Sequence, residues 1–346
     1  MVGQGVGGNA AFRRTLRTAG RYEFRRGHLF DQSHRNYAGD LGVGPNPKVV
    51  ARIKASDLVL LVGGRMGEMP SQGYTLFDIP QPQQTLVHVY PDAEELGRVY
   101  RPHLSINASP TAFAAALEGL QAPNSIAWSG ETRAAHDDYV AFTEQATEVP
   151  GRVNVGEIVV WLRGQLSPED ILCNGAGNFS AWLHRFYRLR RFNTFFAPTS
   201  GSMGYGVPAA VGMQRLYPDR KVFCLAGDGD FLMNGQEFMT AVQYDLPIVI
   251  AIVDNGMYGT IRMHQEREYP GRVVGTALKN PDFAAYARAF GGFGATVEKT
   301  ADFPKAYEAA RASGKPAIIH LKVDPAAITP STTLDAIRSK ALAGNG

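Results

Sequence analysis

The chain has 346 residues, of which 45% are hydrophobic and 19% are charged, and its formal net charge is +3 at pH 7. This length suggests about two domains, each apolar enough to bury a core. The weak net charge argues against a nucleic-acid partner, because the one dense basic run, residues 185–191, is interleaved with aromatic residues and typical of a helix with a solvated face.

Membranes and oxidising compartments are also disfavoured. No apolar stretch approaches the roughly 20 residues that span a bilayer, and the polar, Gly-rich start does not resemble a signal peptide. Cys173 and Cys224 lie in apolar, strand-like runs without metal-ligand spacing. Because such residues indicate buried thiols in a reducing compartment, we expect a cytoplasmic protein with no membrane partner.

The first half of the chain predicts an α/β unit after an irregular start at residues 1–22. Residues 47–55 favour a helix, and the apolar runs 57–62 and 85–90 are typical of strands covered on both faces of a parallel sheet. Ser109 and Pro110 then predict the N-cap and first turn of a helix that reaches Leu120. We interpret residues 23–121 as a partial middle domain.

A second α/β domain is expected at residues 151–330. Before it, residues 122–150 form a linker with a polar helix at about 129–148, and after it residues 331–346 form a tail. Helical segments separate four predicted strands, at residues 171–174, 221–226, 247–253 and 317–323. This alternation implies right-handed crossovers. The sequence therefore predicts an α/β fold of two doubly wound, mainly parallel-sheet domains.

One βαβ unit of the second domain brings polar residues together. Its first strand ends at Gly227-Asp228-Gly229, and its second strand ends just before Asn255. Between them, Asn234 and Glu237 can form the reciprocal cap of a helix that runs to about Tyr244. The carboxyl ends of parallel strands meet at one edge of the sheet, where ligands of open α/β sheets bind.

The chemistry of this edge suits a metal diphosphate. Asp228 offers a carboxylate and Asn255 an amide oxygen, which are hard ligands for Mg²⁺, and the glycines let backbone N–H groups approach a phosphate. A Gly-Asp-Gly turn alone is also common in structural loops. A calcium loop is excluded, because Met233 stands where that loop requires glycine.

With Asp254-Asn255 at this spacing after Gly227-Asp228-Gly229, the chain resembles the thiamine-diphosphate-dependent enzymes of the acetolactate synthase, pyruvate oxidase and benzoylformate decarboxylase family. The family usually has two asparagines where this chain has Asp254-Asn255. The resemblance implies a Rossmann-like middle domain, a thiamine-diphosphate-binding domain, and Mg²⁺ bound by Asp228, the Asn255 side chain and the Met257 carbonyl. It also places around the cofactor Gly227, Gly229, Asp230, Met257, Tyr258 and Gly259.

Two further segments extend the resemblance. Residues 199–210 resemble the segment that holds the aminopyrimidine, where Gly201 would accept from its amino group and Met203 would support the bent cofactor. Packing in the core is the alternative role of Met203. Residues 175–179 resemble the loop that closes on the diphosphate. Acetolactate synthases have a Gln-His pair there, and this chain has Asn178-Phe179, of which Asn178 is expected to contact the diphosphate.

The first half resembles the family's middle domain through residues 24–26, 36–44 and 57–64. That domain holds flavin in some members and no ligand in others. Gly64-Arg65 stands where flavin binders have a related segment, but the residues after it differ. FAD is therefore the less favoured alternative.

The resemblance implies a carboligase or decarboxylase, thus a transferase or lyase, that acts on a 2-oxo acid. The cofactor carries the chemistry, and the protein orients it. Family members activate the cofactor with a glutamate from a pyrimidine-binding domain. We assign no catalytic residue, because none of the early glutamates has the required context: Glu23, Glu68, Glu94 and Glu95. We expect activity only with a homo-oligomer or a partner chain that supplies this domain.

Other interpretations stay open. The chain could be a non-catalytic cofactor-binding subunit or a fragment of a longer enzyme. A third interpretation, a nicotinamide-dependent dehydrogenase, depends on the Gly-rich motif at residues 3–8, which no predicted strand precedes. The substrate is not identified. Residues 256–275 are expected to flank the reactive end of the cofactor, where Arg262 and His264 could meet a substrate carboxylate or lie on the surface.

Overall fold

The computed structural model describes residues 20–22, 27–118, 120–121 and 124–344. They form two compact units, one reaching Phe142 and including Leu189–Phe192, the other made of Thr143–Arg188 and the chain from Asn193 onwards. The Gly-rich motif at residues 3–8 and residues 24–26 lie outside the described residues. Across the described part of the chain, no helix combines the length and the apolar character needed to cross a membrane.

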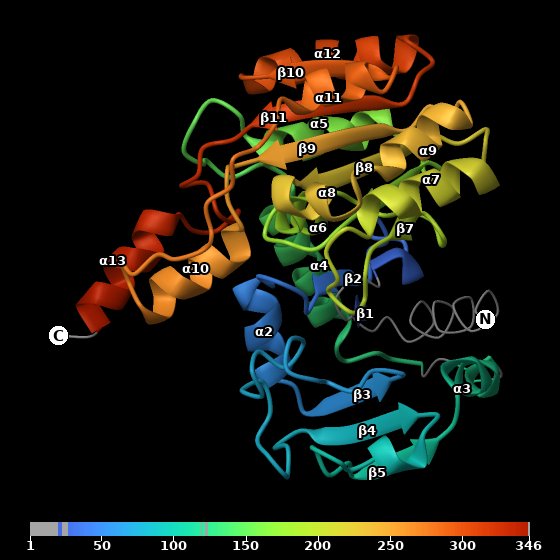
Figure 1. The fold of residues 1–346 in the computed structure, drawn as a ribbon. Coiled ribbons are helices and arrows are strands. Elements are labelled where there is room, and N and C mark those ends of the chain that lie inside the picture. Colours follow the sequence, from blue (N-terminus) through green and yellow to red (C-terminus); the bar gives the residue numbers. More distant parts are fainter. Residues whose placement is uncertain (1–19, 23–26, 119, 122–123, 345–346) are drawn as a thin grey trace. The chain divides into compact units, whose positions relative to one another are not determined.

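The first unit contains a three-stranded parallel sheet in the order β3-β4-β5 (Figure 1). Its strands are β3 (Leu58–Val62), β4 (Thr85–Tyr90) and β5 (Leu104–Asn107). A separate parallel pair joins β1 (Gly20–Tyr22) to β2 (Tyr37–Asp40). The helices are α2 (Pro47–Lys54), α3 (Pro110–Leu117) and α4 (Ser129–Thr143), with short 3₁₀ turns η1 (Gly27–Leu29) and η2 (Ala93–Glu95).

Helix boundaries in this half follow local chemistry. The predicted helix start at Ser109 is confirmed, because the Ser109 hydroxyl accepts from the Ala112 N–H at 3.1 Å. The predicted helix at residues 129–148 is too long, since α4 ends at Thr143. The Arg163 guanidinium donates to the carbonyl oxygens of Thr143 and Glu144, at 3.1 and 2.8 Å, which satisfies them without a further helical turn.

The second unit is built on a six-stranded, fully parallel sheet in the order β10-β11-β9-β8-β6-β7 (Figure 1). Its strands are β6 (Ile171–Asn174), β7 (Phe195–Phe196), β8 (Val222–Gly227), β9 (Val249–Asp254), β10 (Phe293–Val297) and β11 (Ala317–Lys322). Its helices are α5 (Val155–Gln165), α6 (Ser180–Phe186), α7 (Gly206–Leu216), α8 (Asp228–Asn234), α9 (Glu237–Gln243), α10 (Gly259–Glu268), α11 (Phe283–Ala289), α12 (Phe303–Ala312) and α13 (Leu334–Gly344), with the 3₁₀ turn η3 (Thr300–Asp302).

The central strands explain the continuous apolar runs of the sequence. Every residue of β6, β8 and β9 is buried, as expected for parallel strands with helices on both faces. Side chains from neighbouring strands, among them Cys224, Ile250 and Ile252, join one apolar core with Phe231 and Phe238. The α/β class and the parallel sheet predicted from sequence are therefore confirmed.

The strand order fixes where a ligand can bind. After β6 the chain continues to β7 on one side of the sheet, and after β8 it continues to β9 on the other side. The loops that leave β6 and β8 therefore diverge, which opens a crevice outside the carboxyl ends of these neighbouring strands. The Gly-Asp-Gly turn, at the end of β8, lies at this point.

Candidate functional site

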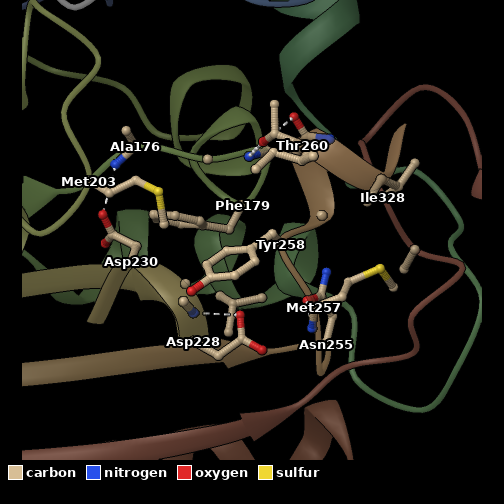
Figure 2. Close-up of a pocket in the computed structure, with 18 of the residues that line it drawn as sticks. Ala176, Phe179, Met203, Asp228, Asp230, Asn255, Met257, Tyr258, Thr260 and Ile328 are labelled. Atoms are coloured by element: carbon tan, nitrogen blue, oxygen red, sulfur yellow. Dashed lines mark hydrogen bonds between the residues drawn. The ribbon is translucent and has the colours of Figure 1, made fainter. Parts of the chain in front are cut away.

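Loops from three neighbouring strands line a single pocket at the carboxyl edge of the second sheet. The lining residues are 176–179 after β6, 227–230 where β8 ends and α8 begins, and 255 and 257–259 after β9. Figure 2 shows these residues facing one another around the pocket. The βαβ path inferred from sequence thus brings together side chains that are far apart along the chain.

Asp228 is the best-placed cation ligand of the pocket. It follows β8 directly and is 3% exposed. Its Oδ1 accepts from the Gly229 N–H at 2.9 Å, and its Oδ2 accepts from the Gly256 N–H at 2.9 Å and from Asn280 Nδ2 at 2.7 Å. These donors are neutral, and no Lys or Arg of the described residues forms an ion pair with it. A carboxylate oxygen has two lone pairs, so Oδ1 can still take a cation.

The electrostatics of Asp228 agree with this role. Burial raises the pKa of Asp228 to about 6, although hydrogen bonds from Gly229, Asn280 and Gly256 oppose the shift. A buried carboxylate held only by neutral donors is costly when charged. A divalent cation would remove that cost. The residues of this site therefore fit a bound metal.

Asn255 and Met257, the other two expected metal ligands, lie in the loop after β9. The Asn255 Oδ1 accepts from the Met257 N–H at 3.2 Å, across a turn in which Gly256 has φ +69°. All three expected metal ligands line the same pocket. Within the described residues, no group of three or more His, Cys, Asp or Glu side chains could hold a metal. A cation here would therefore depend on one carboxylate with amide and carbonyl oxygens, which suits Mg²⁺.

Two aromatic rings explain the glycines of the turn. A β-carbon on Gly227 would lie 2.6 Å from Phe179 Cδ1, and one on Gly229 would lie 2.6 Å from Tyr258 Cε1. Figure 2 shows the Tyr258 ring between Asp228 and Phe179. Close packing alone therefore requires glycine at both positions. The fit to a metal diphosphate rests on the oxygen donors rather than on the glycines.

Asp230 holds two loops around the pocket. Its Oδ1 accepts from the backbone N–H groups of Ala176 at 3.0 Å and Gly204 at 2.8 Å. Figure 2 shows the contact with Ala176 beside Met203. A β-carbon on Gly175 would lie 2.0 Å from either carboxylate oxygen of Asp230, so that glycine is required for close approach. Asp230 lines the pocket, and its carboxylate fixes the loops that carry Ala176 and Met203.

The predicted cap at Asn234 is wrong. Asn234 is the last residue of α8, and α9 begins separately at Glu237 without a side-chain cap. An N-cap must have non-helical backbone angles, whereas Asn234 is already helical. Its side chain instead donates from Nδ2 to the Gly204 carbonyl at 3.0 Å, which adds a second tie to the loop that Asp230 holds.

Asn178 connects the loop after β6 to α10. The Thr260 hydroxyl accepts from the Asn178 N–H and donates to its Oδ1, both at 3.0 Å. Met203, Tyr258 and Gly259 also line the pocket, whereas Gly201 does not. Gly201 instead occupies a turn with φ +79°.

Ile328 and Asn280 were not anticipated in the pocket region. Ile328 lines the pocket, and Asn280 contacts Asp228. No local pattern marks either residue. Thr260, which also lines the pocket, lies in the segment 256–275 that was expected to flank the cofactor.

Arg262 and His264 are not among the lining residues. Arg262 is paired with Glu266 at 2.9 Å, and the exposed His264 ring lies 3.5 Å from Arg267.

Comparisons with known proteins follow the same division of the chain. Residues 11–117 match the central domain of thiamine pyrophosphate enzymes, and residues 175–321 match their C-terminal thiamine pyrophosphate binding domain. The acetolactate synthase large subunit of Corynebacterium glutamicum is 28% identical over 82% of this chain and 46% of its own length. Sulfoacetaldehyde acetyltransferase of Alcaligenes xylosoxydans is 26% identical over 86% of this chain and 55% of its own length.

A solved structure shares the fold. The Rhodococcus jostii thiamine diphosphate-dependent 4-hydroxybenzoylformate decarboxylase aligns with a TM-score of 0.73 at 23% identity, over 92% of this chain and 58% of that one. The chain spans about half the length of the curated relatives that it matches. Two domain models of one family together match most of the chain, at residues 11–117 and 175–321, and show that the chain belongs to the thiamine pyrophosphate enzymes.

Proposed function

We propose that this chain binds thiamine diphosphate through Mg²⁺ held by the Asp228 carboxylate, the Asn255 side chain and the Met257 carbonyl. The observation that carries the proposal is the buried Asp228 carboxylate, which has only neutral hydrogen-bond donors and lies beside further oxygen ligands. The match of residues 175–321 to a thiamine pyrophosphate binding domain supports the same site.

The reaction that we propose is an acetolactate-synthase-like carboligation or decarboxylation of a 2-oxo acid in the cytoplasm. When bound, the cofactor supplies a carbanion that adds to the substrate carbonyl and allows carbon dioxide to leave. The protein's part is to hold the diphosphate at the Asp228 end of the pocket. Asn178 and Gly229 line that end, and Met203 lines the pocket toward the loop of Gly204.

The Met203 end of the site opens onto an exposed apolar face of the same unit. A hollow there is lined by residues that include Met203, Tyr205 and Pro208. Tyr205, which lines this hollow, is 39% exposed. On α8 and α9, the helices that contact α7, Leu232 is 45%, Met233 45% and Met239 41% exposed. Exposed large apolar side chains on neighbouring helices are typical of interaction sites. We propose that a pyrimidine-binding domain from a separate chain covers this face and supplies the activating glutamate.

An assay of carbon dioxide release from pyruvate tests this division of labour. With thiamine diphosphate and Mg²⁺, the 346-residue chain alone should release carbon dioxide no faster than its Asp228→Ala variant. If the chain alone turned pyruvate over and Asp228→Ala abolished that turnover, the need for a partner domain would be contradicted. The proposed cofactor site would still stand.

A further inference from the structure

Asn280 connects the expected metal carboxylate to a second carboxylate. Its Nδ2 lies 2.7 Å from Asp228 Oδ2 and 2.7 Å from Asp254 Oδ1. Because carboxylates only accept, the amide must turn its NH₂ group toward both of them. Its own Oδ1 is then buried without a hydrogen-bond partner among the described residues. The amide thus leaves its acceptor unsatisfied in order to donate twice.

The backbone fixes Asn280 in this position. The Tyr258 N–H donates to the Thr276 carbonyl at 2.9 Å, and the Leu278 N–H donates to the Gly256 carbonyl at 2.8 Å. These bonds pair the segment before Asn280 with the loop that carries Asn255 and Met257. The position of Asn280 relative to the metal loop is therefore set by two backbone hydrogen bonds.

Asp254 is anchored from the opposite side. It is 7% exposed, and its Oδ2 accepts from His320 Nε2 at 2.7 Å and from Lys322 Nζ at 2.8 Å. Both donors lie on β11, which pairs with β9 so that Lys322 is opposite Asp254. Burial alone would raise the pKa of Asp254, but hydrogen bonds from His320, Lys322 and Asn280 outweigh it and hold the pKa well below its ordinary value.

We propose that Asn280 is a positioning residue for the metal site, which keeps the Asp228 carboxylate in place beside the Asp254 carboxylate. The proposal rests on the proposed function, because it assigns Asp228 to a cation. Without the shared amide, the Gly256 N–H would remain within reach of both carboxylates, 2.9 Å from Asp228 Oδ2 and 3.1 Å from Asp254 Oδ1. A single N–H shared between two carboxylates would hold Asp228 less firmly than the N–H and the amide do together. Partners that orient a metal ligand in this manner commonly change metal affinity 10- to 100-fold.

Asp254 also gives the inference its specific prediction. If Asn280 serves to hold two like charges together, its importance depends on the charge of Asp254. Removal of that charge by Asp254→Asn should make Asn280 nearly dispensable. A residue that merely fills space would show the same loss in both backgrounds.

The experiment measures Mn²⁺, used as a paramagnetic substitute for Mg²⁺, by the loss of its free electron-spin-resonance signal in the presence of thiamine diphosphate. Asn280→Leu should weaken Mn²⁺ binding by about 10- to 100-fold. Asn280→Ala, whose smaller side chain is easier to accommodate, should show the same loss and serves as the test if the Leu variant does not fold. In the Asp254→Asn background the loss should shrink to about threefold or less. Lys279→Met, which removes an exposed neighbouring charge, is the matched control and should bind as the wild type does.

The outcomes distinguish failure of the Asn280 role from failure of the proposed function. Wild-type affinity in Asn280→Ala, or an equal loss in both backgrounds, would overturn the role of Asn280 while the cofactor site stands. Absence of Mn²⁺ binding by the wild-type chain would overturn the proposed function itself, and with it the inference.

Discussion

Glu266 forms a buried ion pair in the second unit. Its side chain, on α10, is fully buried and accepts from Arg338 of α13 at 2.7 and 2.8 Å. It also accepts from Arg262 Nε at 3.0 Å and from the Gly271 N–H at 2.9 Å. Beside it, Met257 belongs to an apolar cluster that includes α13 side chains. The ion pair that attaches α13 to α10 therefore also helps to hold the α13 side chains against Met257 of the expected metal loop.

We expect Arg338→Met to lower the free energy of unfolding by about 2–3 kcal/mol. The substitution removes two charge-assisted hydrogen bonds, each worth roughly 1.5–3 kcal/mol, and breaking a buried pair costs about 3–5 kcal/mol. Two features place the expectation toward the lower end. Arg262 and the Gly271 N–H still serve Glu266, and the Arg338 side chain is 34% exposed.

Urea unfolding at pH 7 measures this loss, and hydrogen exchange of the α10 and α13 amides shows whether it is local. Asp335→Asn is the control, because the Asp335 side chain is 73% exposed and 3.5 Å from Arg338. Such surface pairs contribute about 0–1 kcal/mol. A loss in Arg338→Met no larger than in Asp335→Asn, with unchanged exchange, would refute this reasoning.

The pH dependence has a definite sign. The hydrogen bond from Arg338 lowers the pKa of Glu266 from its ordinary value of 4.5 to about 2. A carboxyl with a lowered pKa stabilises the folded state above pH 4.5, and this contribution is lost as the pH falls toward 2. The difference in stability between wild type and Arg338→Met should therefore shrink across that interval.

Two further substitutions have defined outcomes. Burial raises the pKa of Asp40 from 3.8 to about 6, so its charged form destabilises the fold above pH 6 and the penalty disappears below pH 4. Asp40→Asn should thus stabilise the fold at pH 7.5 by up to about 3 kcal/mol, measured as a higher midpoint of thermal unfolding, but should not do so at pH 3.5. An equal effect at both pH values would contradict this cause. Gly229→Ala should cost about 1–3 kcal/mol, because its β-carbon would meet Tyr258 at 2.6 Å. Urea unfolding should show most of that loss recovered in the Gly229→Ala, Tyr258→Ala double variant; no recovery would exclude the clash.

The buried centre of the fold could be predicted from sequence because each strand there carries its own signal. The runs at β4, β6 and β8 are mainly apolar and are bounded by turn residues. By contrast, β7 has two residues and β10 is largely half-buried. β5 also went unpredicted; its four residues are mostly exposed. Short or partly exposed strands depend on their neighbours for pairing, so their local sequence does not distinguish them from loops.

The residues of the candidate site also divide into those that the sequence could predict and those that it could not. Asp228 and Asn255 follow predicted strands, so the topology alone brings them to one edge. Asn280 lies in an irregular segment between α10 and α11, and its two carboxylate partners are 52 and 26 residues away. Contacts of that kind exist only after the chain folds. For Asp230 the position was predicted but not the contacts. Its carboxylate, expected beside the cofactor, also accepts from the backbone N–H groups of two loops and so holds them in place.

The cofactor site is tested most directly by calorimetry of thiamine diphosphate binding to the wild-type chain and to Asp228→Ala, each with and without Mg²⁺. We expect the wild type to bind with Mg²⁺ and to bind much more weakly without it. Asp228→Ala should bind weakly in both conditions, because it lacks the buried carboxylate that takes the cation. Equal binding by the two proteins in the presence of Mg²⁺ would contradict the assignment of Asp228 and, with it, the metal-diphosphate site.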